Sequence, residues 1–151
     1  MTYKRMVSTS DPDIPCLISV LKRPEIARFI SIDENNYWYY VTSTANVFFF
    51  KVFKENALVG AIHCEISDKD LSMYIVVFPE YHRKGIATNV LRDIQSGNLP
   101  LDFERIEVFI DVANIASIAL FEKMNFKYVS REDELVRYIY TCNELKNHND
   151  I

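Results

Sequence analysis

Hydrophobic residues follow a strand-like pattern in the middle of the chain. Residues 47–53, 57–66 and 71–77 are rich in β-branched and aromatic residues, and short polar turns separate them. These segments predict the strands of an antiparallel meander. Residues 2–7 predict a further strand at the start of the chain.

Apolar residues recur at helical spacing before this meander. Residues 12–21 predict one helix, and Pro24 begins a second whose apolar stripe extends to Ile30. The aromatic run at 37–41 fits either a helical turn or a short strand, so the pattern alone leaves its structure open.

The last part of the chain alternates helices with strands. Gly85 opens a helix that Gly97 and Pro100 end, and Asn114 caps another helix that runs to Met124. The predicted strands of this part are 106–111 and a final hairpin made of 126–130 and 135–141.

The predicted elements follow the order β-α-α-β-β-β-α-β-α-β-β, which indicates an α/β (α+β) fold. We expect a mixed, mostly antiparallel central sheet with helices on both faces. The strand–helix–strand connection across 71–111 should place two strands parallel and adjacent. A length of 151 residues fits a single domain, 1–151, with a polar tail at 143–151 that we expect to fray.

Composition narrows the function mainly by exclusion. Apolar residues make up 49% and charged residues 25% of the chain, as in ordinary globular proteins. A formal net charge of −4 is unsuited to nucleic acid, whose phosphates require clustered Lys and Arg. The acidic balance suits a cationic partner, although surface acidity also serves solubility alone.

Cysteine spacing and hydropathy exclude further classes of protein. Cys16, Cys64 and Cys142 are far apart and form no CxxC pair, so neither a disulfide framework nor a zinc site is predicted. No signal peptide and no membrane-spanning run is recognisable. We therefore expect a cytoplasmic protein with no metal and no membrane partner.

Candidate chemistry lies in the turn that follows the strand 71–77. The first backbone N–H groups of a helix lack intrahelical acceptors, and with the helix dipole they favour an anionic phosphate. Arg83 and Lys84 add positive charge there, while Gly85 and Ala87 allow a phosphate to approach the backbone. The alternative is a glycine at a helix start beside two exposed basic residues. The glycine patterns of P-loop and Rossmann proteins are absent.

A second motif covers residues 114–126. By itself it predicts a capped helix, since the Asn114 side chain can accept from the N–H of Ser117. Together, the stretch His82-Arg83-Lys84-Gly85-Ile86-Ala87 and the stretch from Asn114 to Phe126 resemble the paired signatures of the GNAT family of N-acetyltransferases. The resemblance covers nearly the whole chain.

This resemblance implies transfer of an acetyl group from acetyl-CoA directly to a primary amine of a small molecule, peptide or protein. Main-chain groups of the strand would pair with the pantetheine arm, and amides of the turn would hold the pyrophosphate. Implied partners are the amine acceptor and a second copy in a homodimer. The implied cofactor-binding residues are Ile75, Val76, Val77, His82, Arg83, Lys84, Gly85, Ile86, Ala87, Thr88, Asn114 and Phe121.

Some residues depart from the family pattern. His82 stands where Gln or Arg is usual, and Asn125 stands where Gly is usual, although Asn tolerates left-handed backbone well. Phe121 replaces a Tyr that often protonates the leaving thiolate, so that role is vacant or filled elsewhere. This vacancy supports the alternative of a non-catalytic acyl-CoA-binding sensor or partner module.

The general base is not identified by the motif. Candidates by sequence proximity are Asp70 and Tyr74, followed by His63 and Glu65. Each has a structural alternative: Asp70 as a turn former, Tyr74 as a packing residue, His63 as a hydrogen-bonded core residue and Glu65 as a solvated strand residue.

By the same resemblance, the acceptor cleft would be formed by the early helices with their following loop and by the final hairpin. Carboxylates near aromatic rings in these regions suit a cationic amine, although a solvated acidic loop beside core aromatics is the alternative. The residues concerned are Glu25, Asp33, Glu34, Tyr37, Trp38, Tyr39, Tyr40, Glu132, Asp133, Glu134 and Tyr138.

Overall fold

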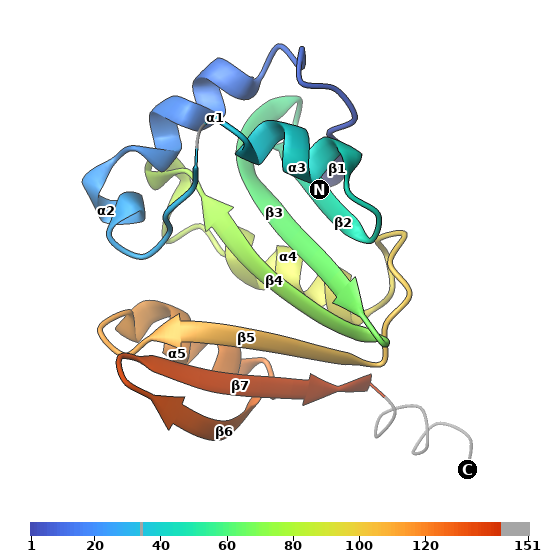
Figure 1. Cartoon of the computed structure of the whole chain (residues 1–151). Helices are drawn as coiled ribbons and strands as arrows, with labels where there is room; N and C mark the ends of the chain where they lie inside the picture. Colours follow the sequence, from blue (N-terminus) through green and yellow to red (C-terminus); the bar gives the residue numbers. More distant parts are fainter. Residues whose placement is uncertain (34, 143–151) are drawn as a thin grey trace. The chain divides into compact units, whose positions relative to one another are not determined.

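The strand-forming segments pair into a seven-stranded sheet in the computed structural model, which describes residues 1–33 and 35–142. The strands hydrogen-bond in the order β1-β2-β3-β4-β5-β7-β6, and the β4–β5 ladder is parallel (Figure 1). The predicted crossover and mixed sheet are confirmed. The strands are β1 (Thr2–Arg5), β2 (Val47–Lys54), β3 (Ala57–Ser67), β4 (Asp70–Val77), β5 (Arg105–Asp111), β6 (Lys127–Glu132) and β7 (Leu135–Thr141).

The helices agree with the predicted positions more closely than with the predicted lengths. The segment 37–41, for which the sequence allowed a helix or a strand, is helical. The helix that Pro24 begins ends after one turn at Ala27, short of Ile30. Among the described residues, no helix has the length and apolar character needed to cross a membrane. The helices are α1 (Ile14–Leu21), α2 (Pro24–Ala27), α3 (Tyr37–Ser43), the 3-10 turn η1 (Pro79–Tyr81), α4 (Ile86–Gln95) and α5 (Ile115–Lys123).

The described chain divides into two compact units. The first unit consists of Met1–Glu65 and Tyr74–Ala87, and the second contains Ile66–Met73 and residues 88–142. The single domain expected from the sequence stays a prediction. The tail expected at 143–151 lies outside the described residues.

The core of the first unit forms where the early helices bury their apolar stripes. Leu17 of α1 and Val41 of α3 are almost fully buried together with Phe49 of β2, and α3 lies next to β2 (Figure 1). The strand β3 is buried on both faces, since the adjacent residues Ala61 and Ile62, whose side chains point to opposite faces, are 4% and 0% exposed. Burial of this kind holds the polar residues of β3 in defined positions.

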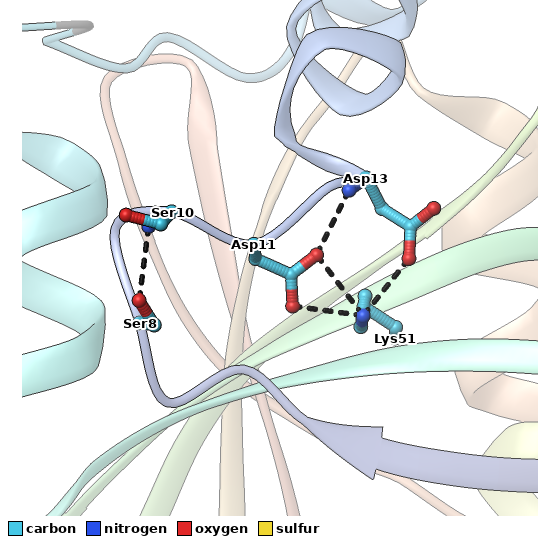
Figure 2. A network of polar contacts seen from close by, with 5 residues as sticks. All are labelled: Ser8, Ser10, Asp11, Asp13 and Lys51. Atoms are coloured by element: carbon cyan, nitrogen blue, oxygen red, sulfur yellow. Dashed lines mark hydrogen bonds and ion pairs between the residues drawn. The ribbon is translucent and has the colours of Figure 1, made fainter.

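A buried lysine ties the segment between β1 and α1 to the sheet of the first unit. The Lys51 side chain lies on β2, and its Nζ is 2.8 Å from an oxygen of Asp11 and 2.9 Å from an oxygen of Asp13 (Figure 2). The other oxygen of Asp11 accepts from the Asp13 N–H at 2.9 Å. Burial alone lowers the pKa of Lys51, but the two carboxylates outweigh it and raise this pKa. The lysine is therefore held as a cation.

The core of the second unit joins α5 to the final hairpin. The Phe121 ring meets the Phe126 ring edge to face at 4.9 Å, and Phe126 stacks on Tyr140 of β7 at 5.5 Å. Asn125 between them has a φ of 70°, so the residue that replaces the usual Gly does adopt the left-handed conformation.

Candidate functional site

The edge of β4 offers main-chain groups to a strand-like partner. The N–H of Phe78 donates to the carbonyl of Val59 on β3 at 2.9 Å. Peptide groups alternate in direction along a strand, so those of Val76 also point to β3, whereas those of Ile75 and Val77 point to the opposite edge. The ladder of β4 with β5 covers Asp70–Ser72 and stops before them. An extended ligand could thus add to this edge.

Gly60 sets the close approach of β3 to this part of β4. A Cβ at position 60 would lie 2.3 Å from the carbonyl oxygen of Val76, nearer than real Cβ atoms come to any backbone atom. Only glycine fits without displacing β4. This glycine therefore serves the geometry of the edge rather than a turn.

The turn between η1 and α4 has the backbone form of an anion-binding loop. Arg83 and Gly85 have φ angles of 62° and 73°, and α4 begins at Ile86, one residue later than the sequence suggested. No atom lies within 4 Å of the position that a Cβ of Gly85 would occupy. A turn that alternates left-handed residues before a helix start can direct successive N–H groups to one side.

Side chains around this turn leave positive charge available. Arg83 and Lys84 are exposed, and neither makes an ion pair with any residue of 1–33 or 35–142. The Lys84 Nζ lies over the Tyr81 ring, 5.7 Å from its centroid. His82 Nε2 lies 2.7 Å from the carbonyl oxygen of Val77, so this side chain closes the end of the β4 edge.

The predicted residues of the second motif lie in the second unit. Asn114 caps α5 as expected, its side-chain oxygen accepting from the Ser117 N–H at 3.3 Å. Phe121 is 6% exposed and belongs to the core of that unit. Thr88 on α4 is also in the second unit, whereas the β4 edge and the turn 82–87 are in the first.

Asp70, one of the two foremost base candidates, is engaged by an arginine. Both carboxylate oxygens accept from Arg105, at 2.8 and 2.7 Å. These hydrogen bonds hold the pKa of Asp70 below its ordinary value. The carboxylate is therefore stabilised in its ionised form, which weakens it as a proton acceptor.

Tyr74, the other foremost candidate, belongs to a linked polar cluster in the first unit. Its hydroxyl lies 2.6 Å from the Tyr37 hydroxyl, which lies 2.7 Å from His63 Nδ1. His63 Nε2 lies 2.8 Å from Glu65 Oε2, and the Tyr40 hydroxyl donates to Glu65 Oε1. The His63 ring stacks on Tyr74 with centroids 4.9 Å apart. We call these five residues the tyrosine–histidine cluster.

Sequence reasoning names all five of these residues without connecting them. Tyr37 and Tyr40 are candidates for acceptor binding, and Tyr74, His63 and Glu65 are separate base candidates. A signal was present, since residues 37 and 40 share one side of a helix and 63 and 65 share one face of a strand. Their meeting with Tyr74 depends on long-range packing and has no local signature.

Burial and hydrogen bonding set the charges in the tyrosine–histidine cluster. Burial raises the pKa of Tyr74 to about 12 and that of Tyr37 well above its usual range. Burial also acts to raise the pKa of Glu65, but hydrogen bonds from Tyr40 and His63 outweigh it and lower this pKa. At neutral pH the phenols are protonated and Glu65 is a carboxylate.

Several residues expected to face an acceptor are buried instead. Trp38 is 7% exposed and packs in the core, and the Tyr138 hydroxyl donates to Glu122 at 2.6 Å. Tyr39 is 69% exposed, and Glu25 and Asp33 are exposed. Glu34 lies outside the described residues. Among the aromatic residues predicted for the early helices, Tyr39 is thus the most accessible.

Comparisons with known proteins agree with this geometry. The model of the acetyltransferase (GNAT) family matches residues 15–126. An N-alpha-acetyltransferase of Saccharolobus solfataricus is 32% identical over 111 residues, which cover 72% of this chain and 61% of that protein. The match therefore spans less than two thirds of the length of this relative.

Solved structures share the fold. A chimera of the spermidine N-acetyltransferase SpeG from Vibrio cholerae and hSSAT has a TM-score of 0.78 at 18% identity, covering 97% of this chain and 100% of the other. The N-acetyltransferase PseH from Campylobacter jejuni, solved in complex with acetyl coenzyme A, has a TM-score of 0.74 at 14% identity, with coverages of 93% and 97%.

Proposed function

The chain belongs to the acetyltransferase (GNAT) family, and we propose that it transfers an acetyl group from acetyl-CoA to a primary amine. The observation that carries the proposal is the order of two features along the chain. The β4 edge at Ile75 and Val77 is followed, after η1, by the turn with left-handed residues at Arg83 and Gly85. An edge for an extended polar chain followed by a cradle for phosphate fits the two parts of coenzyme A. Family membership and the acetyl-CoA complex of a structural neighbour support this assignment.

In this proposal the first unit supplies most of the binding groups. The N–H and carbonyl of Ile75 and the N–H of Val77 pair with the pantetheine arm, and the amides of 82–87 hold the pyrophosphate beside Arg83 and Lys84. The sequence-predicted Val76 contributes through its buried side chain, which keeps β4 in register. Thr88, Asn114 and Phe121 complete the proposed set. When bound, acetyl-CoA supplies an activated thioester carbonyl.

For catalysis we propose Tyr74 rather than Asp70 as the group that receives the acceptor's proton. Tyr74 directly precedes the edge residue Ile75, and its hydroxyl has a hydrogen-bonded partner that can take its own proton. Asp70 is paired with Arg105 and stabilised as an anion. A general base needs affinity for a proton near the working pH, which an arginine partner reduces.

The first acceptor to test is the α-amine of a peptide N-terminus. The 32% identical relative is an N-alpha-acetyltransferase, and a structural neighbour is a spermidine N-acetyltransferase. The net charge of −4 suits either cation. The cytoplasmic location and the homodimer expected from the sequence stay predictions.

Two glycines with the same backbone conformation test the cofactor site. Gly85 and Gly97 have φ angles of 73° and 76°, and a Cβ at either position meets no atom within 4 Å. Gly85→Leu and Gly97→Leu therefore carry similar backbone strain, but only the first places a side chain in the proposed cradle. We expect acetyl-CoA binding at least about 10-fold weaker in the first and nearly unchanged in the second, measured by calorimetry and thermal shift.

Equal acetyl-CoA affinities in the two glycine variants would remove the phosphate cradle from the proposal. Turnover is tested separately, by following CoA release with N-terminal peptides, spermidine and aminoglycosides. We expect release with at least one primary amine. Tight acetyl-CoA binding with no release across this panel would instead favour the non-catalytic module.

A further inference from the structure

When the His63 ring is neutral, the hydrogen bonds of the tyrosine–histidine cluster have a single consistent direction. An ionised Glu65 can only accept, so the proton of a neutral His63 ring lies on Nε2 and its Nδ1 is an acceptor. Nδ1 then accepts from the Tyr37 hydroxyl, whose oxygen accepts from the Tyr74 hydroxyl. Every donor therefore points from Tyr74 toward Glu65, and the Tyr74 oxygen keeps lone pairs for a further donor.

Tyr74 cannot act as a base by losing its own proton to solvent. With its pKa raised to about 12 by burial, about one molecule in 10⁵ would carry a phenolate at pH 7. Tyr37 is more strongly disfavoured as an anion for the same reason. A phenol that passes its proton on while receiving another carries no net charge, so burial does not oppose this process.

We infer that His63, oriented by Glu65, receives the acceptor's proton through Tyr37 and Tyr74. This inference rests on the proposed acetyl transfer. The N–H bond of the acceptor ammonium breaks, its electron pair stays on nitrogen, and a new O–H bond forms on Tyr74. The former Tyr74 proton passes to Tyr37, and the Tyr37 proton passes to His63 Nδ1. Both phenols are neutral again, and His63 is an imidazolium beside the Glu65 carboxylate.

The surroundings of His63 favour this transfer. Its ring is 8% exposed, and the titratable groups that contact it are Glu65 on its own strand, Tyr37 and Tyr40 from α3, and Tyr74 from β4. Phe49 lies opposite it on β2. Within the described part of the chain, no Lys or Arg pairs with Glu65. The Glu65 side chain is 43% exposed, which gives the proton a route to water.

The decisive comparison uses two Tyr→Phe variants of the first unit, both of which keep the aromatic ring. Tyr37→Phe breaks the relay, whereas Tyr3→Phe changes a residue of β1 outside the cluster and outside the proposed binding sites. We expect kcat to fall about 100-fold in Tyr37→Phe and in Tyr74→Phe, and by less than about threefold in Tyr3→Phe, with similar KM for acetyl-CoA. The acid limb of the kcat–pH profile should disappear in Tyr37→Phe.

Equal kcat values and equal pH profiles for Tyr37→Phe and Tyr3→Phe would overturn the relay. Thermal unfolding of each variant establishes that the loss does not come from unfolding. These outcomes require turnover by the wild-type protein. If the wild-type protein shows no turnover, that result counts against the proposed function itself.

A measurement on the free protein tests the relay independently of turnover. Long-range ¹⁵N–¹H correlation spectra report which ring nitrogen of a histidine carries the proton, and His63→Gln identifies the signal among the three histidines of the chain. We expect the neutral form of the His63 ring to carry its proton on Nε2. A proton on Nδ1 would overturn the relay whatever the enzyme assay shows, because Tyr37 could then not donate to His63.

Discussion

Two carboxylates, one in each unit, are held in opposite ways. Glu65, at the end of the first unit's share of β3, accepts from a histidine and a tyrosine and has no arginine or lysine partner in the described chain. Asp70, at the start of β4 in the second unit, accepts hydrogen bonds from Nε and Nη2 of Arg105. Both pKa values are lowered, but only Glu65 connects to groups that can exchange a proton. The partner of a carboxylate, more than its place in sequence, decides whether it serves proton transfer.

The same contrast applies to lysines. Lys51 in the first unit is 8% exposed between two aspartates, whereas Lys69 in the second unit pairs with Asp102 at 3.2 Å on the surface. Of these two lysines, the one in the first unit is buried with specific partners, and the one in the second unit stays near water. Water screens the second kind of pair and not the first.

The largest expected effect comes from removing the buried cation. Lys51→Met leaves Asp11 and Asp13 close together without their cation and should lower the free energy of unfolding by about 3–5 kcal/mol. The matched change Lys69→Met should cost about 0–1 kcal/mol, because that pair is exposed. Urea denaturation measures both. Similar losses in the two variants would contradict the contrast between the units.

Next in size is the loss of the proton acceptor. His63→Gln can still hydrogen-bond to Glu65 but cannot take up a proton, so we expect kcat to fall about 100-fold. Asp70→Asn should change kcat by less than about threefold, since Asp70 is already paired with Arg105. Steady-state kinetics with a confirmed amine acceptor measures both, and the reverse order of effects would restore Asp70 as the base.

A smaller effect is expected from the surface ion pair itself. Arg105→Gln should lower the free energy of unfolding only slightly, because side chains that are 47% and 39% exposed are well screened. In 1 M salt the difference from the wild-type protein should largely vanish. Urea denaturation at low and high salt measures this, and a large cost that salt leaves unchanged would place the pair among the buried ones.

The smallest effect concerns acid stability. A lowered pKa of Glu65 means that its stabilisation is present above the unfolded value, near 4.5, and is lost as the pH falls through the folded value. The cost of Glu65→Gln should therefore shrink by a few tenths of a kcal/mol between about pH 6 and pH 3. Urea unfolding across this range measures it. A cost that grows on acidification would mean that the pKa is raised instead.

Local rules predicted much of the fold. The cap of α5 by Asn114, the left-handed Asn125 and the parallel β4–β5 crossover are all present. The sequence does not decide between helix and strand for the aromatic run at 37–41, because a short apolar segment fits the helical and the strand period equally well. It became α3 because its apolar side packs on β2, and that contact is set by the whole unit.

The sequence by itself determined the turn that ends at Gly85 and the strand β4 before it, since a glycine before a helix start and a proline after a strand act within a few residues. Only the tertiary structure joined Tyr37 to His63 and Tyr74, which lie 26 and 37 residues away in the chain. These hydrogen bonds, with oxygen–nitrogen and oxygen–oxygen distances of 2.7 and 2.6 Å, require side chains that are placed to a fraction of an ångström. That placement comes from the register of β2 with β3 and the packing of α3, which no short stretch of sequence encodes.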